Sequence, residues 1–147
     1  MGKGESAVMK IQSWPLALSD TIEQWKDFPF TWGSHDCLQF PFAVAARMLD
    51  YDIYSKIGIE KFPYDSEEGA KAILDEHFGG DMANFISTVF EEKNPKLAQR
   101  GDIVIIEYNG VEYCGVVDSS GRHAACKAKT GIIFAPLSKA VKAWGVE

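Results

Sequence analysis

The residue best suited to covalent chemistry is Cys37, within the stretch Phe-Thr-Trp-Gly-Ser-His-Asp-Cys-Leu-Gln-Phe at positions 30–40. Asp36 precedes it, and an apolar helical pattern begins with it. A thiol in the first turn of a helix is close to the positive end of the helix dipole and to unpaired backbone N–H groups, which both favour the thiolate. Cys37 is therefore a candidate nucleophile. The alternative is a small buried hydrophobe at the start of a core helix, which is the commoner role of a lone cysteine.

A thiol nucleophile needs a base within hydrogen-bond reach, and the sequence offers few. The candidate base is His123, near the start of a predicted strand; its alternative role is that of a surface residue beside a turn. His35 precedes Cys37 by two residues and cannot readily turn back onto a thiol held on a helix, so we expect it to shape the loop. His35, Cys37, His123 and Cys126 could together hold zinc, but their spacing matches neither C-x-x-C nor H-x-x-x-H. We therefore expect no metal and no cofactor.

The first half of the chain has helical periodicity. Helices are predicted over residues 16–27, 37–49, 67–78 and about 85–94, the last stopping at Asn94-Pro95. The segment that begins with Cys37 is apolar nearly all round, as a central buried helix would be. Its fifth residue is Pro41, whose ring presses on the Cys37 carbonyl in an uninterrupted helix, so we expect the helix to begin nearer Gln39. Ser66 is the predicted cap of the third helix, and Gly79-Gly80 its end.

At Gly101 the period changes from that of a helix to that of strands. Strands are predicted over residues 102–108, 111–118, 122–128 and 132–135. Asn109-Gly110 joins the first two and suits a tight hairpin turn with positive φ. Residues 136–144 are predicted to form a short closing helix. Helices followed by an antiparallel meander indicate an α+β fold with a helix on one sheet face, in a single domain over residues 1–147 with residues 1–12 flexible.

Composition and charge exclude several functions. The formal net charge of −6 argues against nucleic-acid binding, which requires clustered Lys and Arg to neutralise phosphates. No segment is long and apolar enough to cross a bilayer or to act as a signal peptide, so we expect synthesis in a cytoplasm. Three cysteines without a C-x-x-C pair match neither a disulfide scaffold nor a structural zinc site.

The order of these motifs resembles the NlpC-type papain-like cysteine peptidases over roughly residues 28–135. Trp-Gly-x-x-Asp-Cys precedes a helix, Arg-Gly-Asp-Ile-Val opens a hairpin, and Gly-Val-Val follows in the second strand. Within that superfamily the chain is most similar to a phage- and prophage-associated branch encoded among tail genes. The segments that carry this similarity are residues 32–37, 50–58, 69–74, 98–104, 114–118, 123–137 and 143–144. The resemblance implies a papain-like fold with Cys37 as the nucleophile and Asp36 as the acid that precedes it.

The sequence departs from the family at the base. Active NlpC-type enzymes place a histidine two residues before the Gly of the second strand, and this chain has Tyr113 there. A phenol of ordinary pKa is a poor base at neutral pH. His123 is about two residues early for the third catalytic position of the family, which falls nearer Ala125. These departures, together with Pro41, predict a degenerate catalytic site.

Three functions are compatible with these residues. The first is a phage or prophage tail-tip or assembly protein that uses the scaffold for binding, made in the bacterial cytoplasm and then carried in the virion tail. Its expected partners are other tail proteins, through exposed aromatic residues such as Trp14. The second is a working peptidase or amidase that cleaves peptidoglycan stem peptides during genome delivery. The third is a cytoplasmic hydrolase or acyltransferase unrelated to phage.

Overall fold

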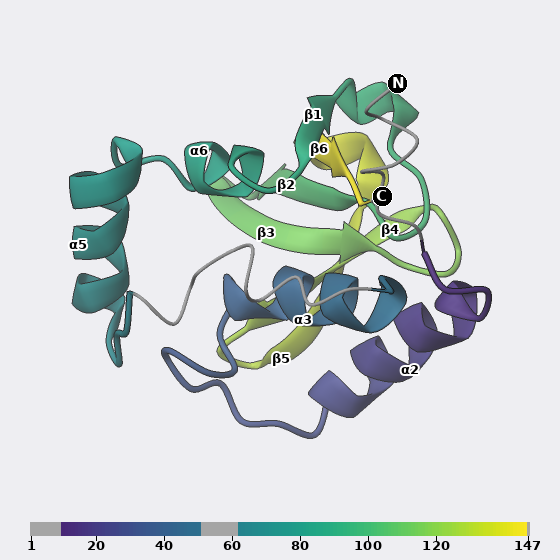
Figure 1. Ribbon diagram of the computed structural model, residues 1–147, viewed down its shortest axis with the longest axis horizontal. Coiled ribbons are helices and arrows are strands. Elements are labelled where there is room, and N and C mark those ends of the chain that lie inside the picture. The colour runs from purple at the N-terminus through teal and green to yellow at the C-terminus, as the bar shows by residue number, and fades with distance from the viewer. Residues whose placement is uncertain (1–9, 51–61, 147) are drawn as a thin grey trace.

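The computed structural model of the protein describes residues 10–50 and 62–146, and within them helices come first and a sheet follows (Figure 1). The helices are α2 (Trp14–Trp25), α3 (Gln39–Met48), α5 (Glu67–Phe78) and α6 (Met82–Ser87). The strands are β1 (Glu91–Lys93), β2 (Ile103–Tyr108), β3 (Val111–Val117), β4 (His123–Ala128), β5 (Gly131–Pro136) and β6 (Ala140–Gly145). Two 3-10 turns, η2 (Pro95–Leu97) and η3 (Leu137–Lys139), lie between strands. The predicted α+β class is confirmed.

The six strands form one antiparallel sheet in the order β1-β6-β2-β3-β4-β5. The predicted hairpin of β2 and β3 turns at Asn109 and Gly110, whose φ angles are 53° and 76°. Ile103, Val104 and Val116 are fully buried, as expected for the centre of a sheet. The predicted meander from residue 102 to residue 135 is therefore confirmed.

Side chains of successive strand residues alternate between two apolar clusters. On β3, Cys114 and Val116 belong to the larger cluster, which contains buried residues of α2 and α3. Val117 belongs to a smaller cluster of alanine, valine, isoleucine and cysteine side chains. Helix α3 contacts β3 and β4, and Figure 1 shows it along the sheet. The helices therefore cover one face of the sheet, and the smaller cluster lies on the opposite face.

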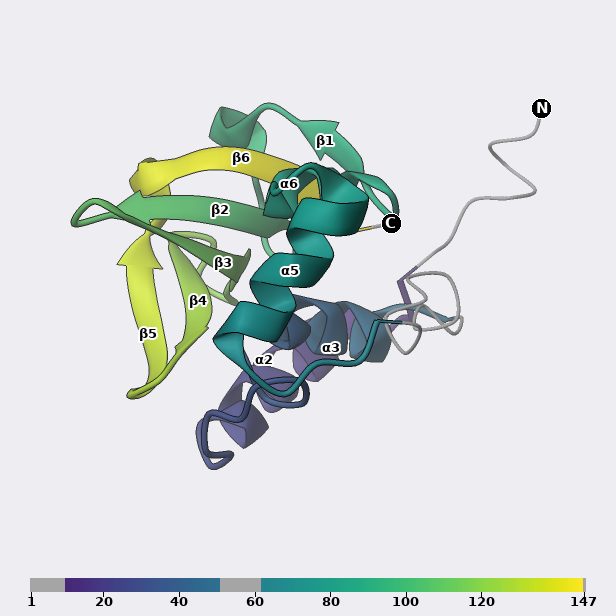
Figure 2. The same ribbon diagram turned by 90° about the vertical axis from the view of Figure 1, so that its left-hand side faces the viewer.

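The third predicted helix begins and ends where its capping residues indicated. Ser66 Oγ accepts a hydrogen bond from the Gly69 N–H at 3.0 Å, and Gly79 takes φ of 66° beyond the last turn. Helix α5 contacts α6; Figure 2 shows the two together, and Figure 1 shows α5 to one side of the strands. Local capping chemistry was enough to fix both ends of α5.

The closing segment was predicted as a helix, and this prediction was wrong. Residues 137–139 form one 3-10 turn, and residues 140–145 form β6, which lies between β1 and β2. Trp144 is fully buried, and its Nε1–H donates a hydrogen bond to Ser87 Oγ at 2.9 Å. Pairing with two strands and burial of this ring outweigh the modest local preference for helix.

The helix predicted over residues 85–94 was also too long. It ends at Ser87, and Glu91–Lys93 is a short edge strand paired with β6 rather than a solvated helix end. Lys93 Nζ lies 2.8 Å from a carboxylate oxygen of Asp102, which is almost fully buried. Pairing with β6, together with this ion pair, therefore places the segment in the sheet, and local periodicity does not encode either contact.

Two predictions fall wholly or partly outside the described residues. The motif at residues 50–58 is described only at Asp50, and the segment 1–12 only at residues 10–12. Lys10 forms an isolated bridge with Leu49, and the Ile11 N–H donates to the Met48 carbonyl at 2.9 Å. Over the described ranges, no helix combines the length and apolar character needed to span a membrane.

Candidate functional site

The loop between α2 and α3 is organised by the carboxylate of Asp36. This side chain is fully buried and accepts four hydrogen bonds. The donors are Gly33 N–H at 2.8 Å, Leu38 N–H at 2.9 Å, Gln39 N–H at 2.8 Å and the Tyr64 hydroxyl at 2.7 Å. Two of these amides open the helix that follows, so Asp36 caps it as an N-terminal acid does. The acid of the Trp-Gly-x-x-Asp-Cys motif therefore holds the loop in shape.

Gly33 is required by the same arrangement. Its φ is +91°, a conformation that residues with a Cβ rarely adopt. A Cβ built there would lie 2.1 Å from the Tyr64 carbonyl oxygen. The spacing of Gly33 and Asp36 thus has a structural explanation, because the glycine amide donates to the carboxylate while its bare Cα allows the Tyr64 backbone to approach.

Helix α3 begins at Gln39, which confirms the expectation drawn from Pro41. The Phe40 N–H still donates to the Asp36 carbonyl at 3.2 Å, so a first turn begins before the regular helix. Cys37 lies in this first turn, two residues before the helix. It is placed beside the N–H groups of the helix start but not within the helix.

The thiol of Cys37 is half-buried, and its surroundings disfavour ionisation. Burial raises the pKa of Cys37 to about 11, and the neighbouring carboxylate of Asp36 adds to the increase. The backbone N–H groups of Cys37 and Leu38 act in the opposite direction, and their effect on the pKa is smaller. The thiol therefore stays protonated at neutral pH.

The described residues include the three histidines of the chain, and none of their imidazoles hydrogen-bonds to Cys37 Sγ. The ring of His35 lies 4.9 Å from that of Trp25 and 4.4 Å from that of Phe28, so His35 packs within the loop as predicted. His123 is exposed, and its Nδ1 lies 3.4 Å from Ser120 Oγ. His123, the predicted base, is thus in a turn-flanking position without a contact to the thiol.

Tyr113, at the position where the resemblance expects a histidine, packs against the smaller cluster. It alternates along β3 with Cys114, which belongs to the cluster shared with α3. A side chain at position 113 therefore points to the sheet face opposite α3. Similarly, His123 and Cys126 are three positions apart on β4 and point to opposite faces. Among residues 10–50 and 62–146, no three His, Cys, Asp or Glu side chains converge as metal ligands.

Residues 9–146 match the model of a family described as a domain of unknown function, DUF6950. The chain belongs to this family. The match spans every described element, including the loop of Gly33 and Asp36. No curated protein matches the sequence.

Two residues that shape this DUF6950 domain were missed by sequence reasoning. Burial and the Asp36 carboxylate hold the pKa of the Tyr64 hydroxyl above its usual range, so it remains a donor to that carboxylate. Lys127 is buried on β4, and its Nζ donates to the Trp25 carbonyl at 3.1 Å and to the Phe28 carbonyl. Tyr64 is 28 residues from Asp36, and Lys127 is 102 residues from Trp25, so no local pattern links them.

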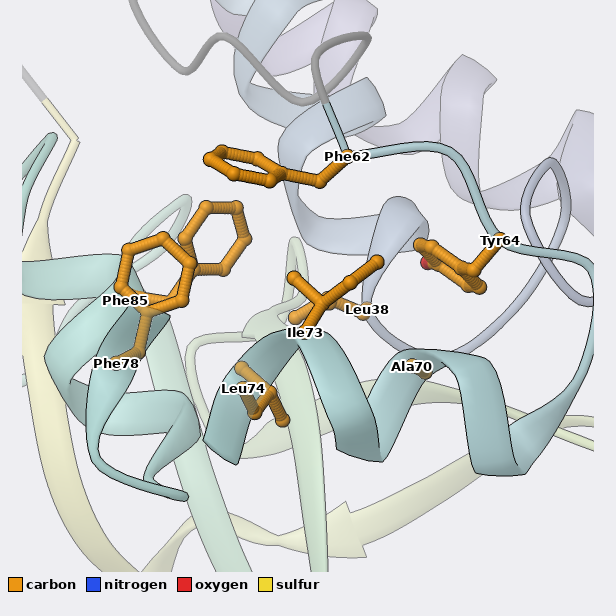
Figure 3. A pocket seen from close by; sticks show the side chains of 8 residues that line it. All are labelled: Leu38, Phe62, Tyr64, Ala70, Ile73, Leu74, Phe78 and Phe85. Carbon is orange, nitrogen blue, oxygen red and sulfur yellow. The ribbon is translucent and has the colours of Figure 1, made fainter. Parts of the chain in front are cut away.

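A small apolar cavity lies beside the loop, between α5 and the start of α3 (Figure 3). Its volume is about 10 Å³, roughly the space that one water molecule requires. The lining residues are Leu38, Phe62, Tyr64, Ala70, Ile73, Leu74, Phe78 and Phe85. Figure 3 shows the rings of Phe78 and Phe85 and the side chains of Ile73 and Leu74 gathered at it. A cavity of this size is a packing gap and has no room for a peptide substrate.

Proposed function

We propose that this DUF6950 domain is a tail-associated binding module of a phage or prophage, built on an NlpC-like scaffold with a degenerate catalytic site. The observation that carries the proposal is the state of Cys37. Its thiol has a raised pKa and no imidazole partner among the described residues. The helices followed by an antiparallel sheet are compatible with the resemblance to NlpC-type proteins.

The chemistry of Cys37 supports a role other than hydrolysis. With a pKa of about 11, only about one thiol in ten thousand is ionised at neutral pH. The thiolate is the nucleophile, so the rate of attack falls with that fraction. Asp36 cannot act as the base in place of a histidine. Its carboxylate is fully buried and already accepts four hydrogen bonds from the protein.

A peptidase or amidase acting on peptidoglycan stem peptides is the second candidate function. One observation favours it: Cys37 is only half-buried, and the N–H groups of Cys37 and Leu38 stabilise its thiolate. In that case Cys37 would be the nucleophile, and His123 would have to move towards it.

Trp14, proposed as an exposed anchor for a partner, is in fact half-buried. It packs against the larger cluster, and the guanidinium carbon of Arg100 lies 5.3 Å from its ring centroid. Leu16, two residues further along α2, is 61% exposed and is better placed for a contact. The proposed partners are still other tail proteins, with Leu16 in place of Trp14 as the contact residue.

Co-purification with the tail proteins encoded beside it tests the proposal. The wild-type chain and Cys37→Ser are expected to bind the same tail component and to be found equally in purified virions. Leu16→Asp should weaken binding while Leu97→Asp, at an exposed residue of η2, serves as the matched control. A monomer that binds no tail protein at micromolar concentration would contradict the proposal. Hydrolysis of stem peptides that is lost in Cys37→Ser would instead establish the peptidase.

A further inference from the structure

A second region of the molecule, remote from Cys37 in sequence, carries an incompletely neutralised charge. Lys127 is only 1% exposed, and its ammonium bonds to two backbone carbonyls at the end of α2. Carbonyls at a helix C-terminus carry partial negative charge and attract a cation. They are dipoles, however, and they do not cancel a full charge.

A second lysine, Lys93, shows what compensation by a buried carboxylate looks like. Lys93 Nζ lies 2.8 Å from a carboxylate oxygen of Asp102. Within the described ranges, Lys127 has no carboxylate within ion-pair distance. Burial without a counter-ion lowers the pKa of Lys127, as expected where an ammonium is taken out of water. An ammonium has three N–H donors, and two of them are used here.

Lys127 lines an open groove of about 250 Å³ between the end of α2 and the β4–β5 turn. The groove is bounded by Lys26, Asp27, Phe28, Pro29, Phe30, Lys127, Lys129, Thr130 and Gly131. Lys26 is paired with Glu23 at 2.9 Å, and Asp27 contributes one negative charge. Phe28, Pro29 and Phe30 line one side of the groove, and Lys129, Thr130 and Gly131 line the other. The groove therefore combines a buried cation with an apolar wall.

The surrounding segment is basic although the protein is acidic. Residues 119–146 contain Arg122, Lys127, Lys129, Lys139 and Lys142 but no Asp or Glu, whereas the whole chain has a net charge of −6. Of these residues, Lys127 and Lys129 line the groove, where together with Lys26 they outnumber its one carboxylate, Asp27, so the groove attracts anions although the whole protein is acidic.

We propose that this groove binds a carboxylate attached to an apolar or aromatic group, with Lys127 Nζ donating its third hydrogen bond to the carboxylate and Phe28 and Phe30 contacting the apolar part. One negative charge matches the one uncompensated buried ammonium. Phosphate is the less suitable anion, because it has no apolar part for Phe28 and Phe30 to contact and Asp27 opposes its second negative charge. This binding site does not depend on the proposed tail association.

The test is a titration of the ¹⁵N-labelled chain with benzoate at constant ionic strength, followed by amide chemical shifts. Benzoate is expected to bind with saturation in the millimolar range and to shift the amides of residues 26–30 and 127–131. Benzamide, which has the same shape without the charge, should bind at least about tenfold more weakly, because it forms no charge-assisted bond. Inorganic phosphate should also bind more weakly than benzoate.

Two variants distinguish a direct contact of benzoate with Lys127 from a general effect of positive charge on binding. Lys127→Met should weaken benzoate binding about tenfold or more, whereas Lys71→Met, at an exposed lysine of α5, should leave it unchanged. Equal binding of benzoate and benzamide, tighter binding of phosphate, or unchanged affinity in Lys127→Met would overturn the proposal. If Lys127→Met does not fold, the comparison of the three probes on the wild-type chain still decides it.

Discussion

The loop between α2 and α3 is held at each end by a buried charge, and the two charges are satisfied to different degrees. Asp36 accepts four hydrogen bonds from protein donors, whereas Lys127 bonds to two carbonyls and faces an open groove. A group whose partners are complete stabilises the fold and has no capacity left for a ligand. We therefore infer a structural role for Asp36, in the region that resembles an active site, and a binding role for the groove at Lys127.

The largest effect is expected from Asp36→Ala. It leaves the Leu38 and Gln39 amides without their acceptor and should lower the free energy of unfolding by about 3 kcal/mol or more, since bonds to charged groups are the strongest of their kind. Asp20→Ala, at an exposed residue of α2, is the control and should stay within about 0.5 kcal/mol of wild type. Urea denaturation measures both. A loss as small as the control's would show that Asp36 is free for chemistry.

Gly33→Ala should follow, with a loss of about 2–3 kcal/mol in the same measurement, because it adds a clash with the Tyr64 carbonyl to an unfavourable φ. Gly110→Ala is the matched control: its φ is +76°, and a Cβ there meets nothing within 4 Å. Only the cost of the left-handed backbone, about 1 kcal/mol, applies to it. Equal losses would contradict the close approach of the two segments.

Tyr64→Phe removes one of the four donors to Asp36 and should reduce stability by about 1.5 kcal/mol, the value for a hydrogen bond to a charged group. Tyr108→Phe, at the exposed hairpin tip, should have no measurable effect. Thermal denaturation of the two variants side by side gives the difference. If they were equally stable, Asp36 would not depend on Tyr64.

Lys127→Met should have the smallest effect, about 1 kcal/mol, because an apolar side chain of similar length replaces a charge that the protein does not neutralise. Lys93→Met should be more destabilising, since it leaves Asp102 buried without its cation. Urea denaturation of both variants measures the loss in free energy of unfolding and shows which lysine the fold depends on more. A larger loss for Lys127→Met would mean that its two carbonyl bonds are sufficient compensation.

Local chemistry predicted the elements whose signals are local. Ser66 and Gly79 marked the ends of α5, Asn109-Gly110 marked the hairpin, and Pro41 marked the start of α3. The segments at residues 88–94 and 136–144 were predicted wrongly because the pairing of β1 with β6 decides their structure, and those strands are distant in sequence.

Only the part of the candidate site that has a local signal was predicted. Asp36 and Cys37 were named from a local motif, but the donor from Tyr64 and the cation of Lys127 arrive from far along the chain. His123 was selected as a base by its residue type and by its place near the start of a predicted strand. Which sheet face a strand residue points to depends on register, and the sequence did not specify that for Tyr113 and His123.

The most direct test of the account is the pH dependence of Cys37 alkylation by iodoacetamide, resolved by peptide mass spectrometry so that Cys114 and Cys126 are followed separately. With a pKa of about 11, the native rate at Cys37 should rise with pH without reaching a plateau below about pH 10, whereas the unfolded chain should titrate near pH 8.5. Near neutral pH the native thiol should therefore react more slowly than the unfolded one. A plateau with its midpoint below about pH 8, reached faster than in the unfolded chain, would show an activated nucleophile and contradict the account.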